Sequence, residues 1–195
     1  MTRKPAAGKA SKPKPTLIVE PDSFAGIPEA INALADAAKN GDDDKLLQAT
    51  KWLMIEGDAA VDPLAQVLND EQADLAPRIA VCRTLRELGS KAKPALIQAL
   101  GSESKQLQLN AIKALGLVRP ADRDTVQTLM DLLDSDDERL QLEAILALGN
   151  IGPPAKDMCG ERLVGILNDA EENGTLRDAA KRALKNINPR RKFTD

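Results

Sequence analysis

The side chains that could do chemistry are few and lie far apart in the sequence. The chain has no histidine and only two cysteines, Cys82 and Cys159. A cysteine becomes a nucleophile when a nearby base or positive charge lowers its pKa, and histidine is the usual base. Two isolated cysteines also form no metal-ligand spacing and no disulfide framework. We therefore expect Cys82 to be a small core residue, Cys159 to be more open, and neither to be catalytic.

Two acidic clusters are the remaining candidates for a metal site. Residues 42–44 read Asp-Asp-Asp, and residues 134–138 read Asp-Ser-Asp-Asp-Glu. Neither has the glycine and the closing glutamate of a calcium loop. Both precede a helical stretch, where carboxylates favour the positive end of the helix dipole. The clusters therefore predict helix N-termini, with no metal and no cofactor. Ser135 and Thr175 each have an acid three residues later, which is the spacing of a capping box.

Charge is distributed unevenly along the 195 residues, whose net charge is -3. Residues 1–16 carry five basic residues and no acid, and residues 190–195 carry three basic residues and one acid. The body between them, 17–189, has 19 basic and 29 acidic residues. We expect an acidic body with a disordered basic N-terminal tail and a short basic C-terminal tail. No apolar run reaches the length of a membrane span or signal peptide, so we expect a cytoplasmic protein without membrane contact.

Composition and internal repeats predict the fold. The chain has 29 alanines and 27 leucines but only three aromatic residues, which favours an all-α structure. Residues 96–116 and 129–149 are identical at 11 of 21 positions and share one helical apolar face. Such self-similarity is typical of stacked helix pairs. We predict one repeat domain, 17–189, with five pairs at about 24–57, 60–89, 92–118, 122–152 and 155–188.

The second helices of these pairs carry a family resemblance. They include PRIAVCRTLRELG (77–89), LQLEAILALGNIG (140–152) and LRDAAKRALKNIN (176–188). These segments resemble the HEAT repeat, especially the short HEAT-like form of phycobilisome lyase subunits. The resemblance implies a right-handed α-α superhelix whose second helices line a concave, protein-binding surface. The family often has arginine at an anchor position near the start of the second helix. Here the five anchors are Leu46, Arg78, Gln108, Gln141 and Arg177.

The anchors assign faces to the second helices. Residues one and four positions after the anchor should contact the next repeat. They are mostly apolar until the last pair, where they are Asp178 and Lys181. A terminal repeat turns a polar face outward, so we expect both side chains to be exposed and the array to end at residue 188. Trp52, the only tryptophan, falls on a core position and is expected to fill the core.

Residues five positions after the anchor should point outward from the second helices. Four of these five residues are basic, on an acidic body. Two interpretations stay open: the side chains are simply solvated and paired with nearby acids, or they form a basic row that binds an extended acidic partner. With two neighbouring polar residues included, the predicted partner-binding residues are Lys51, Arg83, Arg86, Asn110, Lys113, Leu146 and Arg182.

These patterns predict a binding protein rather than an enzyme. The leading hypothesis is a non-catalytic scaffold that binds a protein or acidic peptide along the concave face. The alternative is association with nucleic acid through the basic tails and the basic row, although the tails lack interleaved aromatic residues on which bases could stack. A more remote alternative, implied only by the repeat resemblance, is a bilin lyase or isomerase subunit.

Overall fold

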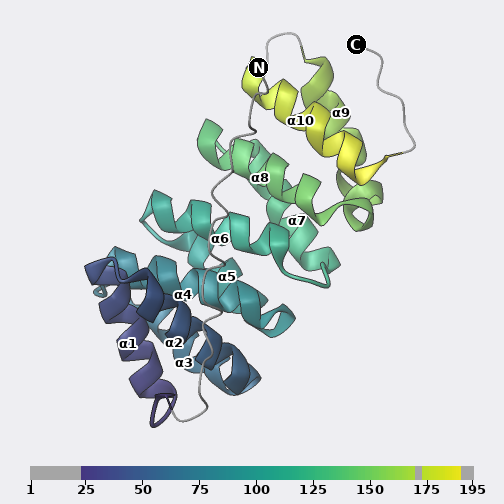
Figure 1. Cartoon of the computed structure of the whole chain (residues 1–195). Coiled ribbons are helices and arrows are strands. Elements are labelled where there is room, and N and C mark those ends of the chain that lie inside the picture. The colour runs from purple at the N-terminus through teal and green to yellow at the C-terminus, as the bar shows by residue number, and fades with distance from the viewer. Residues whose placement is uncertain (1–22, 170–172, 190–195) are drawn as a thin grey trace, which may run out of the picture.

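The computed structural model describes residues 23–169 and 173–189, and within these ranges every regular element is a helix. Figure 1 shows the helices stacked from α1 at one end to α10 at the other. The α-helices are α1 (Ile27–Asn40), α2 (Asp43–Glu56), α3 (Val61–Asn69), α4 (Leu75–Leu88), α5 (Lys93–Gln98), α6 (Lys105–Leu117), α7 (Arg123–Asp131), α8 (Glu138–Ile151), α9 (Lys156–Asn168) and α10 (Gly174–Ile187). The predicted all-α superhelix of about five helix pairs is confirmed. The predicted basic tails, residues 1–16 and 190–195, lie entirely outside the described residues.

Side-chain caps mark the start of every second helix except α4. Asp42 accepts a hydrogen bond from the Lys45 backbone N–H (3.1 Å), and Asp137 accepts from the backbone N–H groups of Arg139 and Leu140. The acidic clusters therefore lie at helix N-termini, as predicted. The two predicted capping boxes are wrong. Ser135 accepts from the Asp137 N–H and lies two residues before the residue that caps α8, and α10 is capped by Asn173 instead of Thr175.

A polar contact joins three of the five anchors, Arg78, Gln108 and Gln141, to the helix before them. The Arg78 Nε donates to the Leu68 carbonyl at 2.8 Å. The side-chain amides of Gln108 and Gln141 donate in the same way, at 3.0 and 3.2 Å, to carbonyls at the end of the preceding first helix. These carbonyls have no partner within their own helix. Arginine and glutamine therefore make the same hydrogen bond to the preceding helix in different repeats.

The second helices α6, α8 and α10 pack at very short range. A Cβ atom built at Gly116 would lie 2.7 Å from the Cα of Ala147, and one built at Gly149 would lie 2.9 Å from the Cα of Ala183. Any side chain larger than hydrogen would collide with the neighbouring backbone. We call these two contacts the glycine seams. The alanines of both seams, Ala147 and Ala183, belong to a continuous core made mostly of leucine and alanine side chains.

The N-terminal end of the stack is less regular. Helix α4 packs more extensively on α1 than on α2. The position that is glycine in α6 and α8 is Met54 in α2 and Arg86 in α4. A contact between the hydroxyls of Thr50 and Thr84, 3.3 Å apart, joins α2 to α4. Trp52 is buried, as predicted, with the Phe24 ring edge-on to it at 5.6 Å.

The last described helix carries the polar residues that were expected to face outward. Asp178 is exposed, as predicted, whereas Lys181 is half-buried and takes part in an interaction of its own. The prediction of full exposure is therefore wrong for Lys181, because the stem of a lysine can lie along a helix surface while its ammonium finds a partner.

Candidate functional site: the face of the second helices

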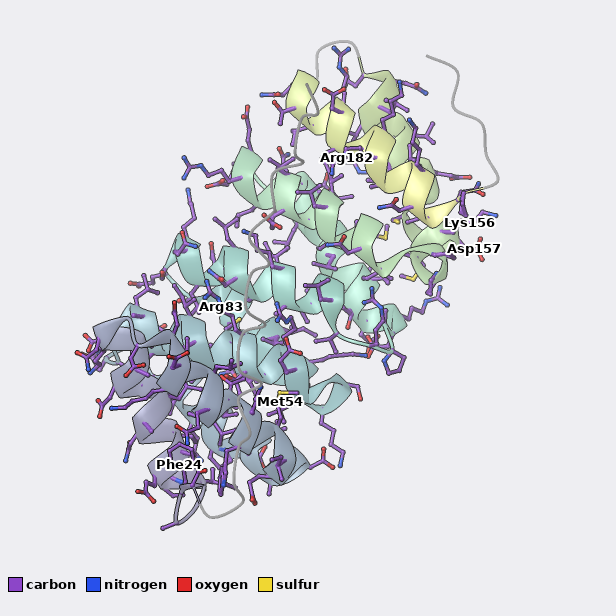
Figure 2. The ribbon with its side chains drawn as sticks, viewed as in Figure 1. Phe24, Met54, Arg83, Lys156, Asp157 and Arg182 are labelled. Carbon is purple, nitrogen blue, oxygen red and sulfur yellow. The ribbon has the colours of Figure 1, made fainter. Side chains whose placement is uncertain are left out.

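The predicted partner-binding residues lie on the second helices, and we call the surface formed by α2, α4, α6, α8 and α10 the second-helix face. Consecutive members α4, α6, α8 and α10 pack against one another, which places successive row positions side by side. Arg83, Lys113 and Arg182 are exposed, whereas Lys51 and Leu146 are half-buried. Figure 2 shows Arg83 and Arg182 on the same side of the molecule, on different helices.

Several of the predicted residues are already engaged within the protein. The Lys113 ammonium lies 3.5 Å from a carboxylate oxygen of Glu143, which is mostly buried. Arg86 is paired with Glu87, its neighbour in sequence. The side-chain amide of Asn110 donates to the Gln106 carbonyl of its own helix at 2.7 Å. Lys51 also takes part in an interaction. The basic row is therefore partly neutralised.

Two members of the row remain available. Neither Arg83 nor Arg182 has an ion pair within the described residues, and both side chains are exposed. Guanidinium groups bind carboxylates through two parallel hydrogen bonds, so each can receive one acidic side chain. The geometry thus supplies two separate cationic points on the second-helix face rather than an unbroken ribbon.

Sequence reasoning missed an apolar feature beside these cations. Leu47, Met54 and Ile55 of α2 are 44%, 41% and 64% exposed, and together we call them the α2 stripe. Met54 and Ile55 lie two helical turns after Leu47, and Lys51 lies one turn from each of the three, so all four share one side of α2. The helical period in the sequence could have revealed the stripe, but the repeat frame assigned Leu47 to an interface with the next repeat.

Both cysteines are buried and unsuited to nucleophilic chemistry. Cys82 is fully buried, as predicted, and desolvation raises its pKa to about 12 despite nearby Arg83 and Arg86. Cys159 is also fully buried, so the prediction of a more open position is wrong. It lies on the inward face of α9, and burial raises its pKa to about 11. Both thiols are therefore protonated at neutral pH.

One ion pair of the described residues has an almost completely buried partner, and its role is structural. Lys93 at the start of α5 is almost completely buried and pairs with Asp122, which caps α7 by accepting from the Thr125 N–H at 2.8 Å. Desolvation opposes ionisation of Asp122, but the hydrogen bonds outweigh it and lower its pKa to about 2. The pair ties one first helix to the next. Within the described residues, no group of three or more potential ligands is placed to hold a metal ion.

A groove of about 460 Å³ lies between α9 and α10 at the C-terminal end. Asp157 and Glu161, one helical turn apart on α9, line it together with Lys156, over the apolar side chains of Val164 and Leu184. Figure 2 labels Lys156 and Asp157 at this end of the stack. Its acidic rim distinguishes it chemically from the second-helix face, and sequence analysis did not predict it.

Comparison with known proteins defines the class. Residues 93–185, just under half of the chain, match the family model of HEAT repeats, so this part of the chain is similar to that family. A comparison with curated protein sequences gives no match. None of the helices in the described part of the chain is long and apolar enough to cross a membrane.

Solved structures with the same fold extend the likeness over most of the chain. The complex of CpcE and CpcF of phycocyanin lyase from Nostoc sp. PCC7120 matches at a TM-score of 0.64 and 21% identity, covering 79% of this chain and 97% of that one. An engineered protein matches at a TM-score of 0.52 and 21% identity, covering 84% of this chain and 80% of that one. Human deoxyhypusine hydroxylase matches at a TM-score of 0.57 and 21% identity, covering 83% of this chain and 63% of that one. At 21% identity, these structural matches show a shared fold and nothing beyond it.

The prediction that the chain is not an enzyme is wrong. Two of the similar structures, the lyase and the hydroxylase, are enzymes built on the same helical stack. A HEAT-like stack carries no catalytic group of its own, so the fold is compatible with both binding and catalysis.

Proposed function

We propose that this HEAT-repeat scaffold binds a protein or acidic peptide along its second-helix face. The observation that carries the proposal is the pair of exposed arginines, Arg83 on α4 and Arg182 on α10, without ion-pair partners in the described part of the chain. Both stand out because the sequence from 17 to 189 has 19 basic and 29 acidic residues. Isolated cations on an acidic body recruit carboxylates selectively.

The separation of the two arginines indicates the size of the partner. Three helix-to-helix steps separate α4 from α10, and stacked helices lie about 8–10 Å apart, so the arginines span about 25–30 Å. One acidic side chain cannot reach both. The proposed partner therefore presents carboxylates at two separated points, either on an extended peptide or on a protein surface.

The experiment measures binding of a fluorescein-labelled oligoglutamate peptide, long enough to span both arginines, by fluorescence anisotropy. Arg83→Glu combined with Arg182→Glu is expected to weaken binding by about tenfold or more, because two charge-assisted contacts become repulsive. The matched control combines Arg123→Glu and Lys156→Glu, which change the net charge equally from the exposed starts of first helices α7 and α9. Equal weakening by both pairs would mean that net charge alone drives binding.

Generic duplex DNA is the second probe, because nucleic-acid association depends on the same arginines together with the tails. Duplex DNA carries negative charge more densely than oligoglutamate, so the acidic body should repel it more strongly, and we expect weaker binding of DNA at the same salt concentration. Tighter binding of DNA would favour the nucleic-acid alternative. Only the shared fold supports the bilin lyase alternative. The cytoplasmic location stays a prediction.

A further inference from the structure

The exposed large apolar side chains within the described residues concentrate on α2, which carries three of the five. At the equivalents of Met54, α6 and α8 have Gly116 and Gly149, both closed against an alanine of the next helix. The α2 stripe is therefore an apolar surface at a repeat position that other second helices use for packing. Exposed apolar side chains that cluster on one helix mark interaction surfaces more often than isolated ones do.

The basic side chain of Arg83 borders the stripe on the side of α4, and Lys51 lies within the stripe. The contact between Thr50 and Thr84 places α2 beside α4 at this level. Lys51 follows Thr50 and Arg83 precedes Thr84, so both cations flank the contact. Figure 2 shows Met54 and Arg83 on the same side of the molecule as Arg182. An apolar strip with a positive border complements a helix that has one apolar face and acidic residues next to it.

We propose that the α2 stripe and Arg83 bind an amphipathic acidic helix of a partner protein. Its apolar residues cover Leu47, Met54 and Ile55, and its carboxylates reach Arg83. This inference rests on the proposed function and names the chemistry of the partner at one end of the second-helix face. A helix is the fitting partner because the backbone groups of α2 and α4 are used within those helices and offer no edge to an added strand. The unbranched side chain of Met54 can adapt to the incoming residues.

The methionine methyl groups provide the test, through ¹³C-methyl NMR of the full chain. Met54 lies in the stripe, whereas Met130 on α7 and Met158 on α9 are half-buried on first helices and serve as internal references. The probe is a synthetic helix with leucines three and four residues apart and glutamates between them. A peptide of the same composition in scrambled order and a version with lysine for glutamate are the controls. The glutamate helix is expected to shift Met54 and leave the other two methyl groups unchanged.

Matched variants locate the binding surface while keeping the reporter. Leu47→Gln combined with Ile55→Gln is expected to weaken peptide affinity by about tenfold or more, since each removes apolar contact area. Leu75→Gln is the control, because Leu75 is 40% exposed but lies at the start of α4, next to Asp74, which pairs with Lys39 of α1. Its affinity should stay within about twofold of the parent protein.

Several outcomes would overturn the inference. If the scrambled peptide binds equally well, or if the peptide binds without moving Met54 and the Arg83 and Arg182 reversals abolish binding, the proposed function stands and the inference fails. If the lysine version binds as well as the glutamate version, both fail. If Leu17→Gln, Ile18→Gln and Val19→Gln together shift Met54 without peptide, the occupant is the chain's own N-terminal segment. If the Met54 signal depends on protein concentration alone, the occupant is a second copy. Either result replaces the proposed partner.

Discussion

Helix α2 at the N-terminal end and the later helices α6 and α8 use the same repeat position in opposite ways. In α6 and α8 this position is Gly116 or Gly149, and the next helix approaches until its backbone nearly touches. In α2 it is Met54, which is 41% exposed. A residue without a side chain closes the stack, whereas a large apolar residue remains at the surface. The part of the chain that matches the HEAT family, 93–185, contains the closed contacts, and the divergent end carries the apolar stripe.

The largest effect is expected in the glycine seams. Gly116→Val would press its side chain into the Ala147 backbone, and we expect a loss of about 3 kcal/mol in the free energy of unfolding, measured by urea denaturation. Gly165→Ala is the control, because its Cβ would meet no atom within 4 Å on α9. It should stabilise the protein by about 0.5–1 kcal/mol through helix propensity. Destabilisation by both substitutions would show that glycine flexibility, not close approach, matters here.

Arginine and glutamine should be interchangeable at the anchor position, because both donate to a carbonyl at the end of the preceding first helix. Arg78→Ala leaves the Leu68 carbonyl buried without its partner, so we expect a cost of about 2–3 kcal/mol. Arg78→Gln installs the residue that α6 and α8 use for this contact, and its cost should be below about 1 kcal/mol. Thermal and urea unfolding of both variants measure the difference. Equal losses would indicate that the arginine charge, rather than the hydrogen bond, is required.

Acid should weaken the link between α5 and α7. The pKa of Asp122 is lowered from 3.8 to about 2, so the folded state favours the ionised carboxylate. Its contribution to stability is therefore fully present above about pH 4 and is lost as the pH falls through 2. Wild-type protein should lose its melting-temperature advantage over Asp122→Asn across this range. A constant difference between the two proteins would contradict the assignment.

The smallest effect on stability is expected at the α2 stripe. Met54→Gln removes apolar atoms that are already partly in water, so the free energy of unfolding should change by less than about 0.5 kcal/mol. Binding of the acidic amphipathic peptide should nevertheless weaken. If Met54→Gln destabilises the protein as strongly as Gly116→Val, the stripe is part of the packed stack and the contrast between α2 and the glycine seams disappears.

The fold was largely predictable because its information is local and repeated. Apolar residues recur with the helical period, so helix pairs and the burial of Trp52 and Cys82 followed from register alone. Caps were harder, because a carboxylate nearer the helix start displaced Ser135 from the capping role. Cys159 was misjudged because its burial depends on how α9 rotates within the stack, which no single segment specifies.

The candidate site was less predictable than the fold. Position in the repeat identifies which side chains lie on the second helices, but pairing depends on distances between helices. Glu143 approaches Lys113 from the next repeat, a contact that the sequence does not specify. The exposure of Leu47 depends on how α4 divides its packing between α1 and α2. The sequence therefore predicted a row of basic residues on the second helices. Contacts between helices engage some of these residues, and Arg83 and Arg182 remain without ion pairs in the described part of the chain.

Backbone amide NMR with oligoglutamate gives the most direct test of the central claim, which is that the second-helix face binds an acidic partner. We expect the largest shifts around Arg83 on α4 and Arg182 on α10, with the exposed starts of α7 and α9 at Arg123 and Lys156 unchanged. Shifts concentrated at those first-helix positions, or spread evenly over every exposed basic residue, would contradict the account.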